Sequence, residues 1–200
     1  MQLSRIGDSS VCAGFLRFKA DAVSRCAIFV GQISALLLFL LSPHAAAQMQ
    51  ASEPELKAAI LVNMLLFVDW PSQPQQAADR FLLCYLGDSP MATALGQLEG
   101  KLIKGKPLHV MRADADHAGG CHVFYFSSND EAALTKSAPS LRTSRVFLAG
   151  DSPGYLQRGA MLNLELVGGR VAFDIDLRGA RQSGLTVSSK VLRLARQVLE

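Results

Sequence analysis

The chain has 200 residues, half of them hydrophobic, with 20 Lys and Arg against 17 Asp and Glu. The positive excess lies at the N-terminus, because residues 1–25 hold four basic and two acidic residues. Residues 48–200 therefore carry 16 basic and 15 acidic residues (20 − 4 and 17 − 2) and are nearly neutral. They contain no run of Lys and Arg interleaved with aromatic residues, which excludes nucleic acid as the expected partner.

The first 47 residues are typical of a secretory signal peptide. Behind the basic segment, an apolar run of 16 residues (26–41) is followed by an Ala-x-Ala site, formed by Ala45 and Ala47 ahead of Gln48. This order predicts export, with cleavage after Ala47. A retained signal anchor is the alternative, although the run is shorter than the roughly 20 residues that span a bilayer. The mature chain, residues 48–200, has the size of one domain with its own core.

The first element expected in the mature chain is an apolar helix. Ser52 is the predicted N-cap, Glu55 completes a capping box, and Pro71 is expected to end the helix after Trp70. Three polar residues interrupt its apolar surface: Lys57, Asn63 and Asp69. The pattern favours a core helix, with a face offered to a partner as the alternative. A polar linker is predicted between Pro71 and Asp79.

Short strands and helices alternate from residue 81 onward. Strands are predicted from their apolar content at 81–86, 106–112, 121–126 and 145–150. Helices are predicted between them, at 91–98 and from Asn129 or Asp130 to Lys136. Most of these strands lack polar alternation, which is typical of strands covered on both faces. The order therefore predicts an α/β domain with a mostly parallel central sheet and flanking helices.

The C-terminal part is expected to form a β-hairpin and a helix. Gly168-Gly169 separates the alternating runs 160–167 and 170–177, and a type I′ turn needs positive φ at both central positions. Ser188 or Ser189 is expected to cap an amphipathic helix that continues to the end of the chain. Its apolar face is predicted to consist of Val191, Leu192, Leu194, Ala195, Val198 and Leu199.

Two of the four cysteines, Cys12 and Cys26, belong to the predicted leader. Cys84 and Cys121 remain, each in an apolar run that predicts a strand. An even count in an exported chain favours a disulfide between them, provided that the two strands lie side by side. Two buried free thiols are the alternative.

The first of two serine motifs is an incomplete nucleophile elbow. Residues 150–154 fit the pattern G-x-S-x-G and follow a predicted strand. Pro153 stands where the oxyanion hole needs a backbone N–H, and proline has none. No histidine follows His122, so the Ser, Asp, His order cannot be completed. A tight turn is the better interpretation.

The second serine motif resembles the nucleophile block of Gly-Asp-Ser-Leu esterases. Gly87-Asp88-Ser89 follows a predicted strand, and Asp114 and His117 supply an Asp-x-x-His. In that family the Asp-x-x-His lies close to the C-terminus, whereas here it lies in the middle of the chain. An esterase with Ser89 as nucleophile is the least favoured function, and no catalytic residue is assigned.

Two other groups of polar residues are interpreted as structural. Residue types that bind metals occur in and after the predicted loop 113–120: Asp114, Asp116, His117, Cys121 and His122. An oxidised Cys121 could not serve as a thiolate, so no metal or cofactor is predicted. Asp174 and Asp176 share one face of a predicted strand. Their carboxylates are expected to face solvent rather than to perform acid/base chemistry.

The mature chain resembles the YfiR-like family of small periplasmic proteins. The matching pieces occur in one order over nearly all of it: Lys57-Ala58, Asn63, Phe67 and Trp70-Pro71, then Leu83-Cys84, Leu86-Gly87, Cys121, Gly150-Asp151-Ser152-Pro153-Gly154, Gly159-Ala160-Met161, Phe173-Asp174-Ile175, Gly184-Leu185 and Ser188-Ser189. The resemblance implies a family domain over residues 48–200. It also implies structural roles for eight motif residues: Asn63, Phe67, Trp70, Pro71, Gly87, Phe173, Ser188 and Ser189.

The resemblance implies a periplasmic regulator rather than an enzyme. The best-known family member binds the periplasmic sensor part of an inner-membrane diguanylate cyclase and inhibits it, and an outer-membrane lipoprotein can sequester that repressor. The expected partners are therefore such a cyclase or a similar sensor, and an outer-membrane lipoprotein. That member's second disulfide has no counterpart here, because no cysteine follows Cys121. Formation of a homodimer is a further possibility that the sequence does not decide. A small-ligand receptor is the alternative function.

Overall fold

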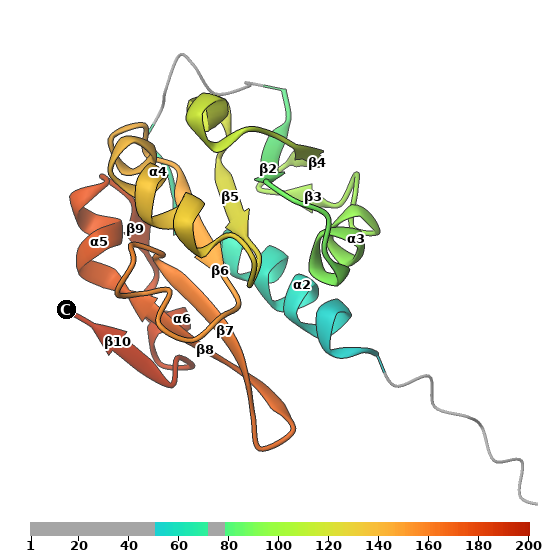
Figure 1. Ribbon diagram of the computed structural model, residues 1–200, viewed down its shortest axis with the longest axis vertical. Coiled ribbons are helices and arrows are strands. Elements are labelled where there is room, and N and C mark those ends of the chain that lie inside the picture. Colours follow the sequence, from blue (N-terminus) through green and yellow to red (C-terminus); the bar gives the residue numbers. More distant parts are fainter. Residues whose placement is uncertain (1–50, 72–78) are drawn as a thin grey trace, which may run out of the picture. The chain divides into compact units, whose positions relative to one another are not determined.

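The computed structural model describes residues 51–71 and 79–200 (Figure 1). The predicted leader, its cleavage residues Ala45, Ala47 and Gln48, and most of the predicted linker lie outside these ranges. Within them, an eight-stranded sheet has the order β10-β8-β7-β6-β5-β2-β4-β3. Its strands are β2 (Phe81–Tyr85), β3 (Leu102–Ile103), β4 (Lys106–Arg112), β5 (Val123–Phe126), β6 (Phe147–Gly150), β7 (Leu162–Val167), β8 (Arg170–Asp176) and β10 (Gln197–Leu199).

The core of this sheet is parallel, which confirms the predicted α/β class. β2 pairs in parallel with β4 on one side and with β5 on the other, and β6 and β7 continue the parallel order beyond β5. Helices and 3-10 turns connect or flank the strands: α3 (Pro90–Gly96), η2 (Ala115–Gly120), α4 (Glu131–Thr143), α5 (Leu177–Gln182) and α6 (Ser189–Leu192). After β2, the chain adds β3 and β4 on one side of it and then β5 and β6 on its other side. The direction in which strands are added to the sheet therefore reverses between β2 and β5.

The first helix is shorter than the sequence predicts. α2 spans Glu53–Met64, a 3-10 turn η1 follows at Leu65–Phe67, and Val68–Asp69 forms β1. The predicted helix through Trp70 is wrong here, because Val68 and Asp69 pair with the short strand β9 (Thr186–Val187). The N-terminal cap is as expected, since the Ser52 N–H donates to Glu55 Oε2 at 2.7 Å.

Five of the twelve residues of α2 are buried, so one face of the helix belongs to the core. Leu61, Val62 and Leu65 have no exposed side-chain surface. Leu56, Leu66 and Phe67 are the large apolar residues of this segment that solvent reaches. None of the described helices is long and apolar enough to cross a membrane.

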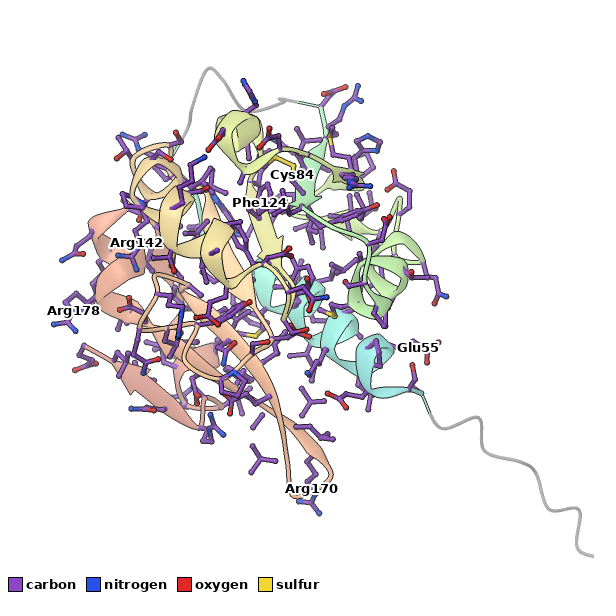
Figure 2. All side chains as sticks on the ribbon, in the orientation of Figure 1. Glu55, Cys84, Phe124, Arg142, Arg170 and Arg178 are labelled. Atoms are coloured by element: carbon purple, nitrogen blue, oxygen red, sulfur yellow. A yellow bond between two sulfur atoms is a disulfide. The ribbon has the colours of Figure 1, made fainter. Side chains whose placement is uncertain are left out.

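The predicted hairpin is present. β7 and β8 are antiparallel, and Gly168 and Gly169 join them with φ of 56° and 76°. A side chain is strained at such angles, which is why the turn uses two glycines. Figure 1 shows the hairpin reaching beyond the other strands, and Figure 2 places Arg170 at its tip.

The predicted C-terminal helix is wrong beyond its first turn. The Ser188 side chain accepts a hydrogen bond from the Lys190 N–H, but α6 ends at Leu192. β10 follows and pairs in parallel with β8. The Arg196 N–H donates to the Phe173 carbonyl at 2.8 Å, and the Arg196 guanidinium binds Asp174. Residues that the periodicity assigns to a helix therefore form the edge strand of the sheet instead.

Several boundaries also differ from the predictions, among them those of α3, α4, β5 and β6. α4 continues from Lys136 to Thr143 with Pro139 inside it, so the predicted end at Lys136 is wrong. A proline removes one helical N–H but does not end a helix whose apolar face is buried. β5 begins at Val123, and Cys121 lies just before it.

Candidate functional site

The predicted disulfide is present. Cys84 in β2 and Cys121 ahead of β5 are bonded, with their Cα atoms 6.1 Å apart. Because β2 and β5 are neighbours in the sheet, the bond links the chain across 37 residues of sequence at adjacent strands. Both sulfur-bearing side chains are buried in the core.

Neither serine motif is assembled for catalysis. Ser89 is the N-cap of α3, and its Oγ accepts a hydrogen bond from the Ala92 N–H at 3.0 Å. His117, the histidine of the predicted Asp-x-x-His, is exposed beside Asp114 and is not among the residues that line the pocket with Ser89. Ser152 is buried, and its N–H donates to Asn163 Oδ1 at 3.1 Å.

The candidate metal ligands are engaged elsewhere. Asp116 pairs with Lys136 at 2.9 Å, and Asp114 lies 3.8 Å from His117 at an exposed position. Cys121 is oxidised. Across residues 51–71 and 79–200, no group of three or more His, Cys, Asp and Glu could hold a metal ion.

The expectation that Asp174 and Asp176 face solvent is wrong. Both side chains are buried. Asp174 Oδ1 accepts from Arg196 Nε at 2.9 Å, while Asp176 Oδ1 accepts the Gly179 N–H at 2.8 Å and Oδ2 lies 3.2 Å from Arg142. Each carboxylate therefore joins the end of β8 to a following segment, which is a structural task.

A polar pocket lies at the carboxyl ends of β2, β5 and β6. Its volume is about 230 Å³. Ser89 follows β2, Ser127 and Ser128 follow β5, and Asp151 follows β6, while α2 contributes Lys57 and Glu53: the full lining is Glu53, Pro54, Lys57, Ser89, Pro90, Met91, Tyr125, Ser127, Ser128 and Asp151. The chain order reverses between β2 and β5, and open α/β sheets bind ligands where this happens.

A buried ionic group forms the wall of this carboxyl-end pocket. Lys57 Nζ lies 2.7 Å from Glu53 Oε1 and 3.6 Å from Asp151 Oδ2, and Lys57 is 6% exposed. Burial raises the pKa of Asp151, and the charge on Lys57 opposes that rise. Burial, followed by the negative charge of Asp151, raises the pKa of Tyr125 far above its usual value.

Two polar atoms of the carboxyl-end pocket are buried without a hydrogen bond. Among the described residues, neither the Tyr125 hydroxyl nor Asp151 Oδ1 has a partner that meets hydrogen-bond geometry. Buried polar groups in proteins are nearly always paired, with protein, water or ligand. Water or a small molecule that offers both a donor and an acceptor would satisfy these atoms.

A pocket at the strand ends is what the alternative receptor function implies, but the sequence does not indicate that these residues together shape one. Lys57 was visible as the lone cation in an apolar helix, and Asp151 as a charge directly after a buried strand. Nothing in the local pattern at Tyr125 separates it from the apolar residues on either side.

An aromatic cluster lies at the opposite, amino end of the sheet. The Trp70 ring contacts Phe81 edge to face, with centroids 5.1 Å apart, and Phe81 stacks on His122 at 4.4 Å. Trp70 Nε1–H donates to the His122 carbonyl at 3.1 Å. The cluster packs Trp70 against the first residue of β2 and against the residue that precedes β5.

The other predicted motif residues lie at junctions between elements. Asn63 Oδ1 accepts from Lys101 Nζ at 2.8 Å. The Phe67 carbonyl accepts the Ser188 N–H at 2.9 Å, and the Phe173 carbonyl accepts the Arg196 N–H. Pro71 follows Trp70, Gly87 follows β2 and Ser189 begins α6. Such positions are consistent with structural roles, which stay predictions.

The fold and the carboxyl-end pocket define an α/β domain with a polar pocket at the strand ends and no assembled catalytic group among the described residues. The chain belongs to the YfiR/HmsC-like family, whose profile matches residues 54–196.

Solved structures with a related fold were also found. A conserved domain protein from Vibrio cholerae O1 biovar El Tor is 16% identical, with a TM-score of 0.50 over 74% of this chain and 61% of its own. An ABC domain in complex with L-Trp from Streptococcus pneumonia is 10% identical, with a TM-score of 0.49 over 73% of this chain and 60% of its own. The chain spans about three fifths of the length of each. The first of these likenesses supports the α/β fold alone.

Proposed function

We propose that the protein is a periplasmic regulator that binds and inhibits the sensor part of an inner-membrane signalling protein, a diguanylate cyclase. The observation that carries this proposal is the family match over residues 54–196. The protein would be exported by the leader at residues 1–47, with cleavage after Ala47, and residues 48–200 would form the regulatory domain. An outer-membrane lipoprotein that sequesters the repressor would complete the system.

Inhibition of a sensor requires binding alone. An inhibitor of this kind prefers the inactive form of a two-state sensor, and the preference itself shifts the equilibrium without chemistry. Such a protein needs a rigid surface rather than a nucleophile and a base. The buried disulfide between neighbouring strands and the buried face of α2 supply that rigidity.

Deletion of the gene is expected to raise the cellular level of cyclic-di-GMP, because the cyclase would lose its inhibitor. Measurement of the nucleotide in extracts tests this. The matched control is complementation with the full chain and with a chain that lacks residues 1–47. The full chain should restore the low level and the leaderless chain should not. An unchanged level on deletion, or equal rescue by both chains, would contradict the proposal.

A second candidate function is a small-ligand receptor, favoured by the two unpaired buried atoms of the carboxyl-end pocket. Native mass spectrometry of the protein purified from the periplasm should then show a bound small molecule. Tyr125→Phe should lose this mass while lowering the stability of the ligand-free protein by no more than about 1 kcal/mol, because the hydroxyl makes no hydrogen bond of good geometry in the fold. The receptor function would be contradicted if the unmodified protein carried no bound molecule, or if Tyr125→Phe carried the same bound molecule as the unmodified protein.

A further inference from the structure

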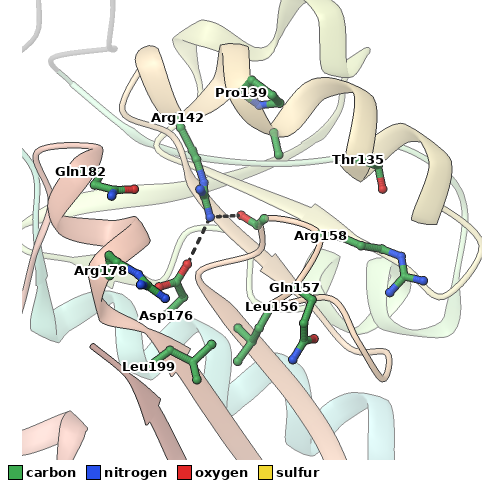
Figure 3. Close-up of a pocket in the computed structure, with 12 residues that line it drawn as sticks. Thr135, Pro139, Arg142, Leu156, Gln157, Arg158, Asp176, Arg178, Gln182 and Leu199 are labelled. Atoms are coloured by element: carbon green, nitrogen blue, oxygen red, sulfur yellow. Dashed lines mark hydrogen bonds and ion pairs between the residues drawn. The ribbon is translucent and has the colours of Figure 1, made fainter.

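A second pocket lies between α4, α5 and the loop that precedes β7 (Figure 3). Its volume is about 570 Å³, and it is separate from the carboxyl-end pocket, with which it shares no lining residue. Three guanidinium groups line it, from Arg142 on α4, Arg158 on the loop and Arg178 on α5. Asp176 is the only carboxylate in this lining. We refer to it as the arginine pocket.

Arg142 is held in place before any ligand arrives. Its Nη2 donates to the Gly159 carbonyl at 3.0 Å and to Asp176 Oδ2 at 3.2 Å. Asp176 is buried and is fixed in turn by the Gly179 N–H. A Cβ at Gly179 would lie 2.3 Å from Asp176 Oδ2 and 2.9 Å from Arg142 Nη2, so only glycine allows this close approach.

The other two arginines differ from one another in their partners. Arg158 pairs with Glu131 at 2.6 Å and donates to the Gly154 carbonyl at 3.0 Å. Arg178 is exposed and makes no hydrogen bond or ion pair with the described residues. Asp176 and Glu131 thus balance Arg142 and Arg158, and one positive charge in the pocket stays without a counter-charge.

We propose that the arginine pocket is a binding site for a small organic anion with a carboxylate or phosphate group. Guanidinium groups bind such oxyanions through parallel N–H···O bonds, which are stronger than neutral hydrogen bonds. The oxyanion would lie between Arg142 and Arg178, which Figure 3 shows approaching the pocket from α4 and α5. The apolar side chains of Leu156 and Leu199 also line the pocket and would contact the hydrocarbon part of the ligand.

This site is independent of the proposed repression of a cyclase. It uses residues of α4 and α5 that neither the disulfide nor the carboxyl-end pocket includes. Loss of ligand binding here and loss of cyclic-di-GMP control are separate observations, so each proposal can fail without the other.

Isothermal titration calorimetry of the purified exported protein tests the site, with inorganic phosphate, citrate and glycerol 3-phosphate as probes at constant ionic strength. At least one probe should bind. Arg178→Gln should weaken that binding about tenfold or more, because a hydrogen bond between charged groups is lost. Since Arg178 has no hydrogen-bond or ion-pair partner among residues 51–71 and 79–200, this variant should keep the melting temperature.

Arg193→Gln is the matched control, because Arg193 is also exposed and lies outside the pocket. It should change the affinity less than about twofold, as expected for a distant surface charge at physiological ionic strength. No binding of any probe at millimolar concentration would overturn the proposal. Equal weakening by Arg178→Gln and Arg193→Gln would overturn it as well, since it would show general attraction of anions to a basic surface.

Discussion

Loss of the Cys84–Cys121 disulfide is expected to lower the free energy of unfolding by about 3–4 kcal/mol. The bond closes a loop over a sequence separation of 37 residues, so reduction frees a long stretch of the unfolded chain. For a domain of this size, such a loss corresponds to a fall in melting temperature of about 10 °C. Urea unfolding of the oxidised protein and of Cys84→Ala/Cys121→Ala measures the difference.

A second comparison separates the bond from the packing of the sulfur atoms. Protein that is unfolded in reductant and refolded keeps both thiols, which still fill the core, but lacks the bond. Its stability should lie close to that of the double alanine variant and well below that of the oxidised protein. Equal stability of the reduced and oxidised proteins would show that loop closure contributes nothing here.

The parallel sheet could be predicted because its strands carry a strong local signal. Phe81–Tyr85 and Val123–Phe126 are continuous apolar runs, and both are covered on two faces in the structure. The hairpin could be predicted from Gly168-Gly169, since few residues other than glycine adopt positive φ twice in succession. In these places local preference and tertiary packing favour the same conformation.

The C-terminal segment shows where long-range contacts override the local sequence preference. Residues 190–199 have helical periodicity, yet only the first turn is helical. Arg196 forms ion pairs with Asp174 and Glu165, which belong to the β7–β8 hairpin. These long-range contacts hold the end of the chain beside β8, and a helical pattern cannot reveal partners that are 22 and 31 residues away in sequence.

The site residues were harder to predict for the same reason. Alternation along a strand suggests which side chains share a face, but it does not say whether that face is later covered. Asp174 and Asp176 do share a task at the end of β8, and the segments after β8 cover both. The carboxyl-end pocket needs α2 beside three strand ends, which is a property of the assembled fold.

Acidification is expected to destabilise the protein well above the pH at which most carboxylates titrate, because of His122. Burial, followed by the charge of Lys106, lowers the pKa of His122 from 6.5 to about 4. Its Nδ1 also accepts the Leu82 N–H at 3.1 Å, which a protonated nitrogen cannot do. The folded state thus favours the neutral ring, so the stabilisation is complete above about pH 6.5 and is lost as the pH falls toward about 4.

The free energy of unfolding should therefore fall by about 2 kcal/mol between about pH 7.5 and pH 5, which urea unfolding at each pH can measure. His122→Asn places an amide oxygen near the position of Nδ1 but does not titrate. It should be less stable at neutral pH, because it loses the stacking on Phe81, and it should lose most of the pH dependence. His109→Asn is the control, since His109 is exposed and pairs with Glu99 at the surface. If His122→Asn kept the full slope while His109→Asn removed it, the acid sensitivity would belong to the surface pair rather than to the buried ring.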